Sequence, residues 1–86
     1  MDIAVFEART LKDKRRVILS LKQRMRNRFN VSVAEVEHTD KAQRCGLGVA
    51  MIAQEARALH SQLDQVVEMV RRTGPLTLVD YHRELL

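Results

Sequence analysis

The chain has 86 residues, of which 15 are Lys or Arg, 11 are Asp or Glu and one is Cys. This length suits one hydrophobic core, and we expect residues 1–86 to form a single domain. The lone cysteine excludes an internal disulfide and is typical of a reducing compartment, so we expect a cytoplasmic protein. The longest uncharged apolar stretch, residues 45–53, is interrupted by glycine and too short to span a membrane.

Positive charge is concentrated near the start of the chain. Residues 9–28 carry nine basic residues and one acidic residue, a local charge of +8, whereas the whole chain carries +4. The other residues are therefore net acidic, and the basic residues do not form an even solubilising coat. A field concentrated on one element indicates a polyanionic partner, with nucleic acid the best candidate.

The first two predicted elements are a short β-favouring run, residues 3–8, and a helix from residue 11 to about 27. Thr10 and Asp13 have the spacing of a capping box at the start of this helix. At 100° per residue the apolar residues share one arc of about 120°, which predicts the core face: Leu11, Val17, Ile18, Leu21, Met25 and Phe29. Lys14 also falls in this arc, from which a lysine can extend its ammonium to the surface. The opposite arc holds Lys12, Arg15, Arg16, Lys22 and Arg26.

The rest of the chain predicts two strands, a helix and a last strand. Residues 30–38 and 45–53 are strand-like and are joined by a polar connection of hairpin length. Residues 54–72 carry apolar residues at helical spacing, and Thr73-Gly74-Pro75 ends that helix. A strand from residue 76 to about 85 completes the order βαββαβ. This order predicts an α+β, ferredoxin-like sandwich: a four-stranded antiparallel sheet with two helices on one face.

Three contiguous segments resemble the YlxP-like family of small bacterial proteins, a domain-of-unknown-function family: TLKDKRRV at 10–17, RNRFNVSVAEV at 26–36 and QRC-x-LGVA at 43–50. The resemblance implies a ferredoxin-like fold and genes often found beside those for translation initiation and ribosome maturation, but no demonstrated activity. The family's first strand usually begins several residues earlier, and its usual loop Trp is Ala42 here. If Met1 is the native start, the central strand is about half its usual length, which would leave ladder groups on its neighbours unpaired or hydrated. A start further upstream is the alternative explanation.

The basic helix has two explanations. An ordinary capped helix with a solvated charged face is one. Against it, Lys12, Lys14 and Arg15 lie where the helix dipole is already positive, and each costs a few tenths to about 1 kcal/mol there. A bound phosphate would make those contacts favourable, and neutralising four phosphates would give a salt dependence of slope about −3 to −4. The leading hypothesis is a non-catalytic protein that contacts phosphates of structured RNA, in rRNA or a ribosomal subunit, through Arg9, Lys12, Lys14, Arg15, Arg16, Lys22, Arg26, Arg28 and Arg44.

The second predicted strand has bulky residues on one face and small residues on the other. Glycines at 46 and 48 are typical of an RNA-recognition strand, but no aromatic residue stands where bases would stack. The thin face instead favours an interface, formed by Gly46, Gly48, Ala50 and Ile52. The alternative function is therefore a protein-interaction module that forms a homodimer through the open sheet face, with the basic helix contacting an acidic protein surface.

Signals for catalysis and for metal binding are weak. His60 and Asp64 lie one helical turn apart, a workable ligand spacing, but two ligands do not make a site. Arg44 beside Cys45 would lower the pKa of its thiol somewhat, although a small buried residue is the commoner role for a lone cysteine. We expect no enzymatic activity, no metal, no cofactor and no small-molecule substrate.

Overall fold

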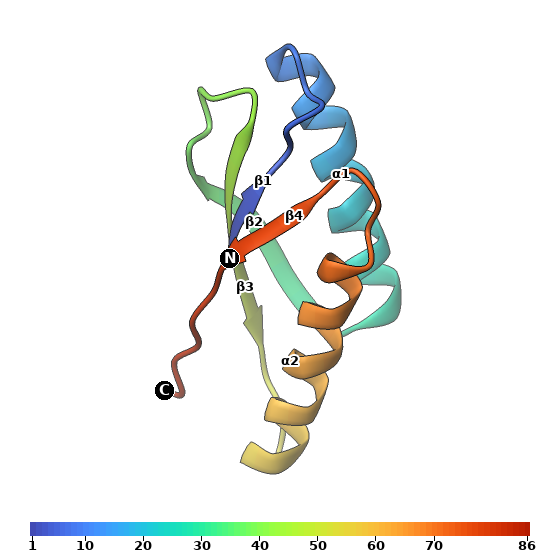
Figure 1. The fold of residues 1–86 in the computed structure, drawn as a ribbon. Coiled ribbons are helices and arrows are strands. Elements are labelled where there is room, and N and C mark those ends of the chain that lie inside the picture. The colour runs from blue at the N-terminus through green and yellow to red at the C-terminus, as the bar shows by residue number, and fades with distance from the viewer.

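The computed structural model describes residues 1–86 and consists of an antiparallel sheet with both helices on one face (Figure 1). The sheet order is β2-β3-β1-β4, so the short strand β1 lies between β3 and β4. This arrangement confirms the predicted ferredoxin-like fold. The elements are β1 (Asp2–Ala4), α1 (Leu11–Arg28), β2 (Val31–Glu37), β3 (Arg44–Met51), α2 (Ala56–Arg71) and β4 (Thr77–Asp80).

Helix α1 begins at the predicted capping box. The Thr10 hydroxyl accepts a hydrogen bond from the Asp13 backbone N–H at 3.1 Å, and the Asp13 carboxylate accepts from the backbone N–H groups of Arg9 and Thr10. These bonds, that from Arg9 first, hold the pKa of Asp13 below its usual range because they favour the ionised carboxylate. The first turn of α1 is therefore fixed without help from its basic side chains.

The hydrophobic core lies between the sheet and the two helices. Ile18, Leu21 and Met25 of α1 are buried, as their shared arc predicts. The inward-facing side chains of β1, β2 and β3 meet them, and α2 closes the core from its C-terminal half; the buried side chains include Ile3, Val33, Cys45, Leu47, Val66 and Val70.

The predictions for the first and last strands along the chain are too long. The first strand spans Asp2–Ala4 and not residues 3–8, and the last strand ends at Asp80 and not near residue 85. Beyond Asp80 no backbone–backbone hydrogen bond involves residues 81–86. The last strand ends at Asp80 because β4 pairs only with β1, and that pairing stops at Asp2.

Lys14 is the one fully buried cation. Its side chain is 0% exposed, and its Nζ lies 2.8 Å from Glu35 Oε2 on β2. The ammonium also donates to the backbone carbonyls of His38, at 2.8 Å, and Arg44, at 3.3 Å. His38 adopts φ 59°, a conformation uncommon for residues with a side chain, and its carbonyl accepts this bond immediately after β2 ends. Lys14 thus joins α1 to both strands of the β2–β3 hairpin.

We predict that Lys14→Ala lowers the free energy of unfolding by about 3 kcal/mol or more, because it leaves the Glu35 carboxylate without its buried counter-charge. Lys12→Ala, which removes an exposed cation two residues away, is the matched control and changes stability by less than about 0.5 kcal/mol. Urea unfolding followed by circular dichroism measures both. Equal unfolding midpoints for the two variants would contradict this role of Lys14.

Candidate nucleic-acid interface

Five cations line the solvent side of α1 and form what we call the basic surface: Lys12, Arg15, Arg16, Lys22 and Arg26. Four of them are exposed and Lys22 is half-buried. No carboxylate oxygen lies within ion-pair distance of any of them. At about 1.5 Å of rise per residue, the basic surface extends over about 21 Å of helix.

Three further cations extend this charge beyond the five. Arg9 precedes the helix, and Arg24 and Arg28 lie in its second half; all three are exposed and form no ion pair. The Arg28 guanidinium lies over the Phe29 ring, 5.6 Å from its centroid. Eight of the nine basic residues between positions 9 and 28 therefore keep charges that no carboxylate of this chain compensates.

The basic surface borders the outer edge of the sheet. Arg26 donates a hydrogen bond of 2.8 Å from its guanidinium to the backbone carbonyl of Val33 on β2. Strand β2 has a neighbour on one side only, so Val33 offers this carbonyl on the free edge. A cation at such an edge also disfavours pairing with another sheet. Arg26 is accordingly held in place, with its remaining donors available to a ligand.

Two residues predicted for nucleic-acid binding do not belong to this surface. Lys14 is wrong as a phosphate contact, because its ammonium is buried and paired with Glu35. Arg44 lies apart from this surface, and its guanidinium is paired with the Asp2 carboxylate, with Nε 3.3 Å from Oδ1. Arg44 projects from β3 on the sheet face opposite the helices, since its neighbour Cys45 points into the core.

The predicted thin interface is partly covered by the protein itself. A Cβ atom added at Gly46 would lie 2.7 Å from Glu37 Cβ, and one at Gly48 would lie 3.2 Å from a methyl carbon of Val36. A β-bulge between Glu35 and Glu37 brings these side chains over the glycines. Gly46 is buried, so its place in the predicted interface is wrong, whereas Ala50 and Ile52 are exposed.

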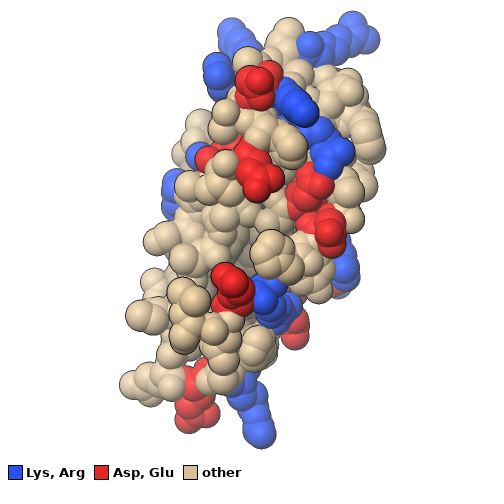
Figure 2. Space-filling model, turned by 90° about the vertical axis from the view of Figure 1, so that its left-hand side faces the viewer, with Lys and Arg blue, Asp and Glu red and all other residues tan.

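The sheet face away from the helices differs in charge from α1. Figure 2 shows this face as mostly uncharged, with acidic side chains scattered across it and Lys and Arg mainly around its rim. The unpaired cations of residues 9–28 lie on and beside α1, whereas Arg44 on the open sheet face is paired with Asp2. A phosphate-binding surface built on α1 would use a different side of the molecule from an interface built on the sheet.

His60 and Asp64 are joined by a third side chain that sequence spacing does not reveal. Arg83 lies with its guanidinium 2.7 Å from Asp64 Oδ1 and 3.3 Å from His60 Nδ1. The carboxylate holds the pKa of Arg83 above its usual range through a hydrogen bond. This pair therefore anchors the C-terminal segment to α2, and a guanidinium occupies the space between the two candidate ligands. The structure contains no group of three or more potential metal-ligating side chains.

Glu35, the partner of the buried Lys14, is not identified by the sequence patterns used above. It shares the inward-facing parity of Val31 and Val33, so it is an acidic residue at a core-facing position of β2. An acidic residue at a core-facing position of β2 and a lysine in the apolar arc of α1 together indicate a buried ion pair. Arg24 was also omitted, because it falls outside the arc that defines the basic surface.

Cys45 is fully buried, as expected for a lone cysteine, but its pKa shifts in the direction opposite to the one predicted. Burial, followed by the negative charge of Glu35, raises the pKa of its thiol to about 12. The Arg44 side chain lies on the other face of the sheet, paired with Asp2, and is not among the groups that shift this pKa.

Neither helix is long and apolar enough to cross a bilayer.

Together these features define a small α+β protein with a ferredoxin-like fold and one uncompensated basic helix. Residues 1–83 match a family described as Protein of unknown function (DUF503). The chain belongs to this family. It is similar to the Uncharacterized protein YlxP of Bacillus subtilis (strain 168), with 30% identity over 66 residues that cover 77% of this chain and 72% of that protein.

We predict that the Cys45 thiol of the folded protein reacts with a disulfide reagent such as DTNB roughly a thousandfold more slowly than a thiol with the ordinary pKa of 9.0. The reason is that a pKa of about 12 leaves three orders of magnitude less of the reactive thiolate at neutral pH. Glu35→Gln removes the nearby negative charge and should speed the reaction. The same protein in concentrated guanidinium chloride gives the unfolded reference rate. Equal rates in the folded and unfolded protein would contradict the buried, protonated thiol.

Proposed function

We propose that this protein is a non-catalytic RNA-contacting protein that binds the phosphates of structured RNA through the basic surface of α1. Lys12, Arg15, Arg16, Lys22 and Arg26 supply the main contacts, with Arg9 and Arg28 at the two ends. The partner is rRNA or a ribosomal subunit. This choice rests on the family's gene neighbourhood, because genes of the family are often found beside those for ribosome maturation.

One observation carries this proposal: the chain neutralises the cation that faces inward and leaves those that face outward without counter-charge. Lys14 receives a carboxylate and two carbonyls, whereas none of the five cations of the basic surface forms an ion pair. Asp13 is the only acidic residue of α1, and its carboxylate accepts hydrogen bonds from the backbone at the start of the helix, so folding leaves most of the positive charge on α1 uncompensated. A polyanion would compensate it, and binding would release condensed counterions.

The distribution of aromatic side chains supports phosphate contact over base stacking. Phe6 is exposed in the loop after β1, and Phe29 packs against the core at the end of α1. Tyr81 lies between two arginines, Arg71 and Arg83, with guanidinium carbons 5.8 and 5.9 Å from its ring centroid. These rings come from three separate places and form no platform along α1. Sequence-tolerant contact with the backbone of folded RNA fits this surface better than recognition of single-stranded bases.

We predict that the double variant Lys12→Glu, Arg16→Glu weakens binding to a structured rRNA fragment at least about tenfold and makes the slope of log K against log salt shallower by about 2, because two phosphate contacts are lost. Lys12→Glu suits the dipole of the first turn, whereas Arg16→Glu removes a cation that favours the ionised Asp13 carboxylate, so we expect the variant to unfold at about the same denaturant concentration as the unmodified protein. Filter binding at several salt concentrations, with urea unfolding of the same samples, measures both quantities.

The matched control is Arg57→Glu, Arg72→Glu, which changes the net charge equally at two exposed positions, one in α2 and one at the C-terminal cap of α2. Arg57 is the second residue of its helix, as Lys12 is of α1. The control should bind within about twofold of the unmodified protein. The proposal fails if the control weakens binding as much as the α1 variant does, or if the unmodified protein does not bind RNA at low salt.

A further inference from the structure

Leu19 lies at the centre of the basic surface, both along α1 and around it. It is seven residues from Lys12 and seven from Arg26, which is about 10 Å of helix on either side. At 100° per residue, its direction lies in the middle of the arc that the five cations occupy. Its side chain is 50% exposed and is not among the apolar side chains that pack against the core. The cations of α1 are therefore arranged around an exposed apolar side chain.

Gln23 lies one turn after Leu19 and is the only uncharged polar residue within this arc. Its side chain is exposed, and its amide forms no hydrogen bond with the rest of the chain. An amide can both donate and accept hydrogen bonds. The basic surface thus has a neutral centre, formed by Leu19 and Gln23. The cations around this centre form two groups: Lys12, Arg15 and Arg16 in the first two turns, and Lys22 and Arg26 further along the helix.

The fold leaves only this outward side of α1 free to contact a ligand. The opposite side of the helix is buried against the sheet, and Arg26 is hydrogen-bonded to the free edge of β2. A ligand therefore meets a convex ridge, one side of a helix about 10–12 Å in diameter. The major groove of an A-form RNA helix is too deep and narrow for such a ridge, whereas the minor groove is wide and shallow and displays ribose 2′-hydroxyls. Of the two grooves of an RNA duplex, the minor groove fits α1.

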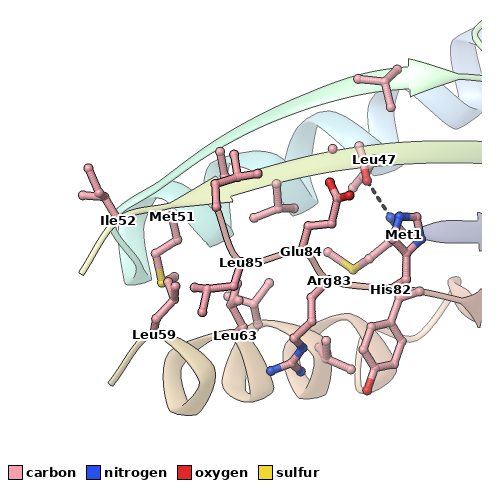
Figure 3. Close-up of a pocket in the computed structure, with 18 of the residues that line it drawn as sticks. Met1, Leu47, Met51, Ile52, Leu59, Leu63, His82, Arg83, Glu84 and Leu85 are labelled. Carbon is pink, nitrogen blue, oxygen red and sulfur yellow. Dashed lines mark hydrogen bonds between the residues drawn. The ribbon is translucent and has the colours of Figure 1, made fainter. Parts of the chain in front are cut away.

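A hollow elsewhere in the molecule does not have this chemistry. It lies between β3, α2 and the C-terminal segment, residues 81–86, and has a volume of about 1010 Å³ (Figure 3). Its lining includes five acidic residues and a single arginine, Arg83, whose guanidinium is bound to Asp64. Phosphates would be repelled there, because like charges raise the energy of the complex. The basic surface of α1 is therefore the better of the two for RNA.

We infer, on the basis of the proposed function, that α1 lies across the minor groove of an A-form RNA duplex. The cations of its first two turns contact phosphates of one strand, and Lys22 and Arg26 contact those of the other. Leu19 packs against the riboses between the two strands. The Gln23 amide forms hydrogen bonds with a 2′-hydroxyl, which is both a donor and an acceptor. DNA lacks this hydroxyl, and the minor groove of B-form DNA is only about 6 Å wide, so the site selects RNA.

The test compares three nucleic acids in filter binding at the same salt concentration. They are an RNA hairpin with a paired stem of about 16 base pairs, the DNA hairpin of the same sequence, and a single-stranded RNA of equal length that cannot pair. We expect the RNA hairpin to bind the unmodified protein at least about tenfold more tightly than either of the others. Polyglutamate, added as a competitor, tests for an acidic protein as the partner instead.

Two variants test the neutral centre. Leu19→Ala should weaken binding to the RNA hairpin about threefold or more without changing the slope of log K against log salt, because no phosphate contact is lost. Gln23→Met keeps the length of the side chain and removes its amide, so it should weaken RNA binding about threefold or more and leave DNA binding unchanged. The matched control is Ser20→Ala, a change at an exposed position of α1 outside the arc, which should leave binding to every probe unchanged.

The outcomes separate this inference from the proposed function. Equal affinity for the RNA and DNA hairpins, a comparison that needs no variant, would overturn the inference and leave the proposed function standing. Unchanged RNA binding by both Leu19→Ala and Gln23→Met, with each variant shown to be folded by circular dichroism, would do the same. Three other results would overturn both: no binding to any RNA at low salt, single-stranded RNA bound as tightly as the hairpin, or polyglutamate competing as effectively as the RNA hairpin.

Discussion

The ion pair between Lys14 and Glu35 fixes how α1 meets the β2–β3 hairpin. A buried ammonium without a partner would cost several kcal/mol, so Lys14 requires both the carboxylate and the two carbonyls that surround it. These groups come from the end of β2, the turn after it and the start of β3. A slip of β2 by one residue would turn Glu35 to the opposite face and leave Lys14 uncompensated. The pair therefore selects one register of the hairpin against the helix, whatever its net contribution to stability.

The same interaction separates the charges of α1 by role. The cation at the core-facing position is neutralised inside the protein, and the cations at outward positions keep their charge. The first turn is held by Thr10 and Asp13, and the inward face by Ile18, Leu21 and Met25. None of these contacts needs an outward basic side chain, so the basic surface is available for a ligand without loss of folding contacts.

Much of the fold follows from local patterns in the sequence. The capping box, the apolar arc of α1 and the alternation of bulky and small residues in β3 each depend on neighbouring residues, and each appears in the structure as predicted. The last strand does not, because its length depends on β1, a strand more than seventy residues earlier in the chain. Val79 and Leu85 have strand-like neighbours, but without a partner beyond Asp2 the backbone after Asp80 has no ladder to join.

The sequence predicts where the basic surface lies, but it does not identify all of the residues that belong to it. Angular position on α1 identifies the five cations of the basic surface, and it also places Lys14 among the apolar residues. It does not reveal which carboxylate reaches a given cation, because Glu35 and Asp2 approach Lys14 and Arg44 only through the sheet.

The central claim is that outward-facing cations of α1 bind RNA phosphates while the rest of the molecule stays unchanged. The most direct measurement is an NMR titration of ¹⁵N-labelled protein with a duplex-stem RNA. The account predicts chemical-shift changes confined to Arg9 and the solvent side of α1, with Arg26 and its neighbour Val33 among the affected residues and with α2 unaffected. Shift changes centred on the open sheet face or on α2, with none in α1, would contradict it.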